Sequence, residues 1–190
     1  MKFFISKIIL LYDTITYCYQ NIEEIIIPSF IKIIGPCAFS NCSELKEVKF
    51  ETNSELRTIE ESSFQNTKIE VFNIPPHLTK ICECAFLECN ELITIEFPND
   101  SEIQTIENYA FSKSTIESLD IPSSLVDLKE NWCEYTNYLN TIAICPNNWR
   151  YKLLENNMII GNSMVGSEKY ENLLFCTRNT KKVKIHFLCF

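Results

Sequence analysis

Ten cysteines and two histidines are the side chains of this 190-residue chain that could bind a metal or act as nucleophiles. Cys82, Cys84 and Cys89 could supply three thiolates, but their C-x-C-x₄-C spacing lacks the C-x₂-C pair that is typical of zinc sites. His77 is the only histidine near them in the sequence, and His186 is the other one in the chain. The pattern therefore favours thiols without a metal, and we expect no cofactor.

Catalysis by a Ser-His-Asp or Cys-His site would have to use His77 or His186. Both are expected at the junction between a strand and a turn, where a solvated histidine is the ordinary case. The chain has three glycines and contains neither GxGxxG nor GxxxxGK[ST], so it has no motif for cradling phosphates. The sequence thus predicts no catalytic residues, and we do not expect an enzyme.

The net charge of -8 and the isoelectric point near 4.9 narrow the range of partners. Nucleic acids and anionic membrane surfaces both require a basic footprint, which this chain lacks. A basic protein partner is the better hypothesis. No stretch reaches the roughly 18 consecutive apolar residues that a membrane helix requires, so no integral membrane segment is predicted.

Self-similarity along the chain determines the expected fold. Segments 27–50, 74–97 and 121–144 match at their apolar positions with an offset of 47 residues, and the shorter segments 54–75 and 101–122 share that offset. An anchor residue, aromatic in four of the five copies, occurs at spacings that alternate between 25 and 22: Phe39, Phe64, Phe86, Phe111 and Cys133. A double repeat of two unequal coils explains this alternation.

Each coil is expected to contribute one short strand and one helical turn. The residues after each anchor end in an alternating apolar pattern such as Val48 and Phe50, which is typical of a strand with one buried face. The Ala-Phe step is too short for a full helix, so we expect a helical or 3₁₀ turn that directs the aromatic ring inward. Stacked coils would form a right-handed solenoid with short parallel strands and one buried ladder of phenylalanines.

The repeat resembles the BspA-like leucine-rich repeat family, whose unit runs roughly IPxxLxxIGxxAFxxCxxLxxIxI. The residues that carry the resemblance are Pro28, Ile31, Ile34, Gly35, Ala38, Phe39, Cys42, Leu45 and Val48, with the equivalent residues Pro75, Leu78, Ile81, Ala85, Phe86, Cys89, Leu92 and Ile95. The family implies a curved solenoid, no catalytic residues, and microbial or protozoan surface antigens that serve in adhesion and protein binding. It therefore implies a cell-surface or secreted protein. An intracellular interaction scaffold and a truncated fragment without independent function are the alternatives.

Three parts are expected along the chain. Residues 1–21 form an incomplete N-terminal coil, 22–145 a solenoid of about five coils, and 146–190 an irregular cap with a partial last repeat. A signal peptide is the alternative for the N-terminus, but the repeat register places Ile9 and Tyr12 at core positions. In the cap, two apolar runs around Ile159 and Leu174 predict a β-hairpin that could cover the last coil, and TKKVKIHF resembles one more strand.

The repeat also limits which cysteines can form disulfides. Cys37 and Cys84 are equivalent, as are Cys42 and Cys89, and equivalent residues two coils apart would be separated by about 10 Å. That distance exceeds the limit of roughly 7 Å between the Cα atoms of a disulfide. We expect at most one disulfide, and we expect Cys42 and Cys89 to pack as small buried residues. Ten thiols with few possible pairs suit a reducing compartment, which favours the intracellular alternative.

The outward positions of the strands form the candidate binding face. Its residues are Glu47, Lys49, Glu70, Asn73, Thr94, Glu96, Glu117 and Asp120. Glu47, Glu70, Glu96, Glu117 and Asp120 are expected to lie side by side at strand spacing in one acidic stripe. The stripe is either a solvated face that keeps the sheet soluble or the docking surface for a protein partner, which would be basic or would belong to a host cell surface.

Overall fold

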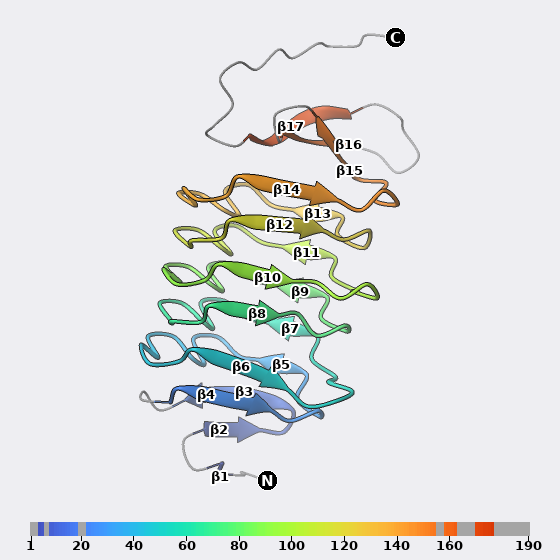
Figure 1. The fold of residues 1–190 in the computed structure, drawn as a ribbon. Helices are drawn as coiled ribbons and strands as arrows, with labels where there is room; N and C mark the ends of the chain where they lie inside the picture. Colours follow the sequence, from blue (N-terminus) through green and yellow to red (C-terminus); the bar gives the residue numbers. More distant parts are fainter. Residues whose placement is uncertain (1–3, 6–7, 19–21, 155–157, 163–169, 177–190) are drawn as a thin grey trace.

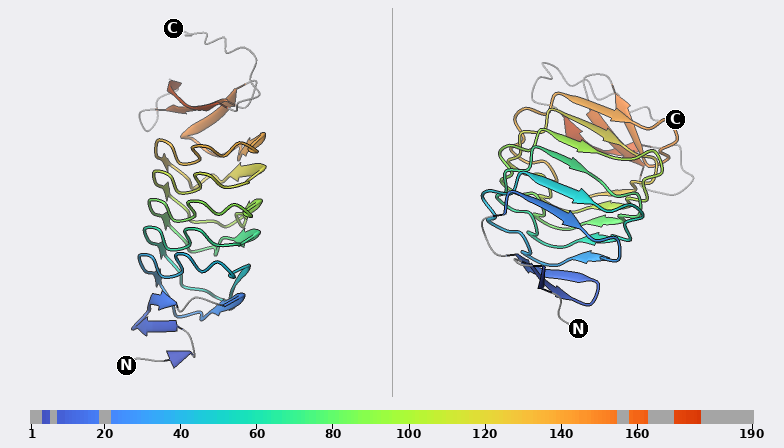
Figure 2. Two further views of the ribbon diagram at one scale, coloured as in Figure 1. Left: turned by 90° about the vertical axis from the view of Figure 1, so that its left-hand side faces the viewer. Right: turned by 60° about the horizontal axis from the view of Figure 1, so that its bottom comes forward.

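The computed structural model describes residues 4–5, 8–18, 22–154, 158–162 and 170–176. Successive coils stack along one axis, with the N-terminal strands at one end and β15, β16 and β17 at the other (Figure 1). The two strands of each coil lie on opposite sides of the stack (Figure 2), so the solenoid has two parallel layers with the core between them. The predicted repeat solenoid is therefore confirmed.

One layer is formed by the strands that the sequence predicts. They are β4 (Glu24–Ile27), β6 (Glu47–Phe50), β8 (Val71–Asn73), β10 (Thr94–Glu96), β12 (Ser118–Ile121) and β14 (Thr141–Ile144). Their central residues, such as Val48, Phe72 and Ile95, point into the core and are buried, while the residues on either side face solvent. We call this outer surface the strand face.

The strand layer is interrupted between β6 and β8. One sheet contains β4 and β6, and another contains β8, β10, β12 and β14 in parallel. The joint between β10 and β12 is also weak, since Thr94 and Ser118 are its only register pair. Both joints follow the longer connections of the double repeat, from Phe50 to Leu56 and from Phe97 to Ile103, which have two more residues than the other connections. The strands of this layer are therefore paired most extensively as β4 with β6, β8 with β10, and β12 with β14.

The second layer was not predicted, because the sequence indicates one strand per coil. It contains β3 (Thr14–Cys18), β5 (Ile33–Ile34), β7 (Thr58–Ile59), β9 (Lys80–Ile81), β11 (Thr105–Ile106) and β13 (Asp127–Leu128), all paired in parallel in that order. In each two-residue strand the second residue is buried and the first is partly exposed. Two residues are too few to display the alternation that identifies a strand in a sequence.

The predicted helical turns at the anchor residues are wrong. Ala38 N–H donates to Gly35 O (3.2 Å) and Cys42 N–H to Phe39 O (3.1 Å), but Cys37 and Asn41 have φ of 54° and 60°, which ends any helix. Residues two before and two after the anchor have positive φ in all five described coils. The turn amides bond to the next coil instead: Cys37 to Glu61 O (2.9 Å), Phe39 to Ser63 O (2.7 Å) and Asn41 to Gln65 O (2.8 Å).

The predicted ladder of anchor aromatics is confirmed. Phe39, Phe64, Phe86 and Phe111 are each 0% exposed, and their successive ring centroids are 5.1, 5.2 and 5.4 Å apart in stacked geometry. The next anchor, Cys133, is buried, and the preceding Trp132 meets Phe111 edge-on at 6.4 Å. One continuous aromatic column therefore crosses the coils.

Antiparallel strands cover the N-terminal end of the second layer. β1 (Phe4–Ile5) pairs with β2 (Ile8–Leu11), and β2 pairs with β3. Tyr12 is in the turn between β2 and β3 with φ of 59°, and its side chain is 77% exposed, so its predicted core position is wrong. The turn reverses the chain there and points the ring outward. The side chain of Ile9 lies outside the described residues.

The predicted C-terminal hairpin is confirmed. β15 (Tyr151–Leu154), β16 (Met158–Asn162) and β17 (Tyr170–Cys176) form an antiparallel sheet in that order. Tyr151 and Ile159 belong to the hydrophobic core, and the Tyr151 hydroxyl accepts the Leu128 N–H at 2.7 Å, so this sheet covers the last coil. The predicted final strand TKKVKIHF, with His186, lies outside the described residues. In the part of the chain that is described, no helix is both long and apolar enough to cross a membrane.

Candidate binding face

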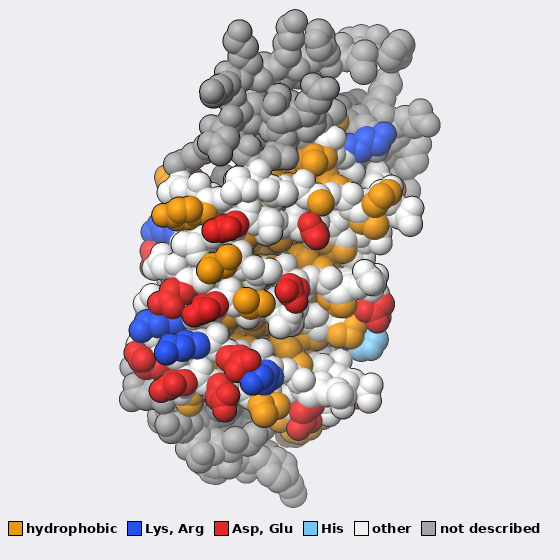
Figure 3. Space-filling view, viewed as in Figure 1, with side chains coloured by type: hydrophobic (Ala, Val, Ile, Leu, Met, Phe, Trp, Pro, Cys, Tyr) orange, Lys and Arg blue, Asp and Glu red, His pale blue; other side chains and the backbone are white. Residues whose placement is uncertain are grey.

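The candidate residues all lie on the strand face or directly before its strands, and the space-filling view shows carboxylates in several rows with apolar side chains between them (Figure 3). Parallel register pairs Asn73 with Glu96, Val71 with Thr94, and Asp120 with Ala143. Glu70 and Glu117 belong to another row, in which Ile93 N–H donates to Glu70 O (2.9 Å) and Glu117 N–H to Ile93 O (3.3 Å).

The prediction of one continuous acidic stripe is therefore wrong. Glu47 is in register with Glu24, Glu96 with Asn73, and Ile93 lies between Glu70 and Glu117. Glu117 and Asp120 come from the same coil. Acids at different phases of the strand pattern fall into different rows, because only residues with the same phase are neighbours across strands.

Lysine neutralises the acids at β4 and β6. Lys49 Nζ lies 2.8 Å from Glu47 Oε2 and 3.9 Å from Glu24 Oε2, and the hydrogen bond to Glu47 raises the pKa of Lys49. Among the ion pairs of the described residues, none involves the exposed acids of β8 to β12, which are Glu70, Glu96, Glu117 and Asp120. Uncompensated negative charge is thus concentrated on that half of the strand face.

A shallow hollow of about 430 Å³ lies within this acidic half. Its apolar side chains are Ile93, which is 43% exposed, and Tyr138, which is 61% exposed. The remaining lining residues are Glu70, Asn90, Glu91, Thr115 and Glu117. Every charged side chain that lines the hollow is a carboxylate. The sequence indicates the outward phase of Ile93, but Tyr138 precedes its strand, so the strand pattern gives no signal for it.

A second, larger hollow of about 970 Å³ opens where the strand layer is interrupted between β6 and β8. Phe50, Val71, Ile74 and Pro75 contribute its apolar part. It also contains the candidate residues Glu47, Lys49, Glu70 and Asn73, together with Lys46 and His77. Its charges are of both signs, and Glu70 borders both hollows.

Of the three cysteines that could have bound a metal, Cys82 and Cys89 have separate partners. The Cys82 thiol contacts Glu60 Oε2 at 3.7 Å, and the Cys89 thiol donates to Phe64 O at 3.1 Å. Burial raises the pKa of Cys82 to about 12 and that of Cys89 to about 11, and it also raises the pKa of Cys84. These thiols are protonated at neutral pH, which makes them poor nucleophiles and poor ligands. No metal-binding group of three His, Cys, Asp or Glu side chains occurs among the described residues.

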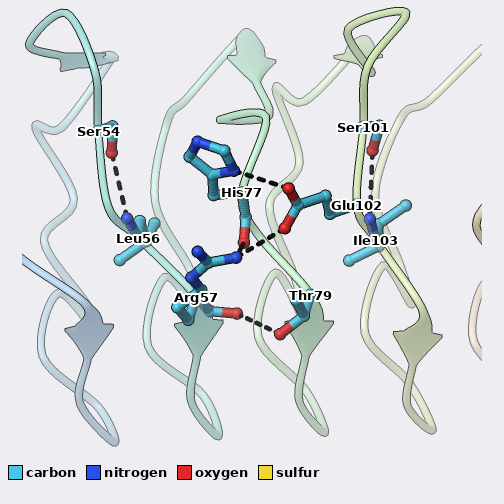
Figure 4. Close-up of polar contacts among 8 residues, drawn as sticks. All are labelled: Ser54, Leu56, Arg57, His77, Thr79, Ser101, Glu102 and Ile103. Carbon is cyan, nitrogen blue, oxygen red and sulfur yellow. Dashed lines mark hydrogen bonds and ion pairs between the residues drawn. The ribbon is translucent and has the colours of Figure 1, made fainter.

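His77 belongs to a polar cluster that connects three successive coils (Figure 4). Its Nδ1 lies 2.9 Å from Glu102 Oε1, and Arg57 Nη1 lies 2.6 Å from Glu102 Oε2 and donates to His77 O at 3.2 Å. The His77 side chain is partly exposed, as expected for a turn histidine, but its ring is in contact with the carboxylate of Glu102. The side chains of Arg57 and Glu102 and the backbone of His77 thus connect the coils to one another.

Stacked coils with a parallel strand in every turn and a shared hydrophobic column define the leucine-rich repeat class of solenoids. The family model described as the BspA type leucine rich repeat region matches residues 12–140 in six copies. The chain belongs to this family. The match starts within the turn before β3 and includes six repeats, one more than the five that we identified from the sequence pattern. No curated protein sequence matches the chain.

Solved structures share the fold. The pneumococcal vaccine antigen PcpA is 26% identical with a TM-score of 0.71, over 76% of this chain and 35% of that one. A leucine rich cell surface protein from Faecalibacterium prausnitzii is 18% identical with a TM-score of 0.53, over 86% of this chain and 59% of that one. A leucine-rich repeat protein from Eubacterium ventriosum is 19% identical with a TM-score of 0.54, over 82% of this chain and 46% of that one. The chain thus spans between a third and three fifths of the length of these proteins.

Proposed function

We propose that the chain is an adhesin-like protein-binding module without catalytic activity, and that the acidic half of its strand face docks a basic protein segment. The observation that carries this proposal is the hollow around Ile93 and Tyr138, where exposed apolar side chains are surrounded by Glu70, Glu91 and Glu117. Exposed apolar side chains rimmed by polar groups are typical of binding surfaces.

The chemistry of the hollow favours lysine and arginine side chains of a partner. Their methylene stems can pack on Ile93 while their cationic ends reach the carboxylates of Glu70 and Glu117. The face of the Tyr138 ring offers a further contact for a cation. An acidic partner would be repelled by these carboxylates and that of Glu91, so charge provides the specificity.

The backbone around the hollow supports docking because it is already ordered. β8 and β10 pair over three residues, and β12 and β14 pair over four. The weaker joint between β10 and β12 is closed at the hollow by the hydrogen bond from Glu117 N–H to Ile93 O. Buried Phe72, Ile95 and Leu119 hold these strands against the core. A partner would therefore meet a preorganised surface, which lowers the entropic cost of binding.

The cell surface or the extracellular space is the proposed location. The family and the likeness to a pneumococcal vaccine antigen support it. An intracellular scaffold is the second candidate, and it is favoured by the eight described cysteines, none of which is in a disulfide. Digestion of intact source cells with an added protease tests this: loss of the full-length chain supports the surface location, and survival until lysis supports the scaffold.

Binding is tested with a short fluorescent peptide of alternating lysine and leucine residues. The peptide should associate with the native protein at a rate that falls as salt approaches physiological concentration, where the Debye length is about 8 Å. The variant Glu70→Lys, Glu96→Lys, Asp120→Lys should lower the association rate on the order of 10-fold without unfolding the protein.

The matched control is Glu61→Lys, Glu83→Lys, Glu130→Lys. It makes the same change in net charge at exposed positions that follow strands of the second layer. It should retain most of the native association rate, because the altered residues follow strands of the opposite layer and do not line the hollow. Equal rates for both variants and for the native protein, with no dependence on salt, would refute the proposed face.

A further inference from the structure

A ladder of small side chains runs beside the aromatic column, three residues after each anchor. Its members are Cys42, Thr67, Cys89, Ser114 and Thr136. Thr67 donates to Phe64 O at 3.0 Å, and its hydroxyl lies 3.4 Å from the Cys89 thiol in the next coil. Ser114 and Thr136 both donate to Phe111 O, at 2.7 and 3.0 Å. Members of the ladder in adjacent coils are therefore close enough for direct side-chain contact.

Cys18 lies beside Cys42, the first member of this ladder, on its N-terminal side. It is at the end of β3, its N–H donates to Ala38 O at 2.8 Å, and its thiol is hydrogen-bonded to the Cys42 thiol. The two side chains are 2% and 0% exposed. Cys18 lies before the segment in which the repeats register, so the sequence pattern does not reveal this neighbour.

The contact between the two thiols suits a disulfide. The backbone of Cys18 is bonded to that of Ala38 and not to that of Cys42, so the side chains bring the two sulfur atoms together, as a disulfide requires. Cys42 and Cys89 are two coils apart, with Thr67 between them. The contact between Cys18 and Cys42 therefore distinguishes this pair from the equivalent cysteines that stacking keeps apart.

We propose that Cys18 and Cys42 form a disulfide that ties β3, and through it the N-terminal strands, to the first complete coil. The oxidant is a disulfide, either oxidised glutathione or the disulfide of a thiol oxidoreductase. One cysteine thiolate attacks the oxidant to form a mixed disulfide and release one thiol. The other cysteine then attacks that mixed disulfide and releases the second thiol. In total the two cysteines lose two protons and two electrons, and the oxidant is reduced to two thiols.

The surroundings favour this pair over the other described cysteines. The hydrogen bond from Cys18 lowers the pKa of Cys42 and so favours its thiolate, the attacking species. Burial raises the pKa of Cys82, Cys89 and Cys133, which keeps those thiols protonated. Cys18 is also near the end of the stack, where the flanking strands β1 and β2 can open without separating two full coils.

The test is oxidation of the full-length chain with excess oxidised glutathione, followed by mass spectrometry of non-reduced peptides. The expected product is a peptide pair joined through Cys18 and Cys42, two hydrogens lighter than the separate peptides. Cys18→Ser and Cys42→Ser should each abolish it, and the matched control Cys89→Ser, at the same place in the ladder, should retain it. Free Cys18 and Cys42 in fully folded, oxidised protein, or a link from either to another cysteine, would overturn the proposal.

Hydrogen exchange gives a second readout that does not depend on the variants. The Cys18 and Gly35 amides donate to Ala38 O and Ile15 O, so both bonds join β3 to the first complete coil. The disulfide would close a loop of 24 residues, from which we expect exchange at these amides to slow on the order of 100-fold on oxidation. If both amides exchange at the same rate in cross-linked and in reduced protein, the disulfide does not stabilise the contact between β3 and the first complete coil, and the proposal is refuted. This outcome is independent of peptide binding at the strand face.

Discussion

Replacing Phe86 with alanine tests the aromatic column at its centre. Phe86 is 0% exposed and contacts three rings, with centroids 5.2 Å from Phe64, 5.4 Å from Phe111 and 4.8 Å from Phe72. Loss of a buried phenylalanine costs about 3 to 5 kcal/mol. Aromatic pairs contribute about 0.5 to 1.5 kcal/mol beyond the buried area, so three lost pairs place the expected cost in the upper part of that range.

The loss is measured by denaturant unfolding, followed by the fluorescence of Trp132, which is buried beside Phe111. The midpoint should fall while the slope is unchanged, because the same surface is exposed on unfolding. Phe30→Ala is the control, since Phe30 is 48% exposed and its loss should cost less than about 1 kcal/mol. A cost below about 1 kcal/mol for Phe86→Ala would mean that the column is not closely packed, and the stacking argument would fail.

Four further substitutions test polar groups of the solenoid. Ser63→Ala should raise the free energy of unfolding by about 1 kcal/mol, because the buried Ser63 hydroxyl has no hydrogen-bond partner among the described residues. Ser114→Ala should lower it by a similar amount, since Ser114 donates to Phe111 O, and equal effects of the two substitutions in urea unfolding would contradict this. Tyr151→Phe should cost about 1 to 3 kcal/mol, because it leaves the buried Leu128 N–H unpaired, and unchanged urea unfolding would contradict the proposed cover of the last coil. Hydrogen bonds from His77 and Arg57 lower the pKa of Glu102, so its stabilising contribution is present at neutral pH and is lost as pH falls below about 4.5, through the lowered pKa. Native protein and Glu102→Gln should therefore differ in melting temperature at neutral pH and converge in acid, and a constant difference would refute this assignment.

The repeat could be predicted because its residues recur at fixed phases. Phe39, Phe64, Phe86 and Phe111 share one position in the unit, and burial of that position follows from stacking. The turns could not be predicted, since several of their left-handed residues, such as Cys37 and Glu88, belong to residue types that give no turn signal. Their backbone is held by hydrogen bonds to the next coil, which a single unit of sequence does not reveal.

The residues of the candidate face could be predicted more easily than their arrangement. Alternation identified Glu70, Glu96 and Glu117 as outward, and they are exposed. Their rows depend on the cross-strand register, which places Ile93 between Glu70 and Glu117. Tyr138 reaches the hollow from outside the strand, so only tertiary structure adds it to the face.

The central claim is that the acidic half of the strand face binds a basic segment. NMR titration of labelled protein with the lysine–leucine peptide tests it most directly, because each backbone amide reports separately. The expected result is a set of shifted amides around Glu70, Ile93, Glu117 and Tyr138, with those of Glu61 and Glu83 unchanged. Shifts confined to residues of the second layer, or no shifts at peptide concentrations that saturate other acidic proteins, would contradict the claim.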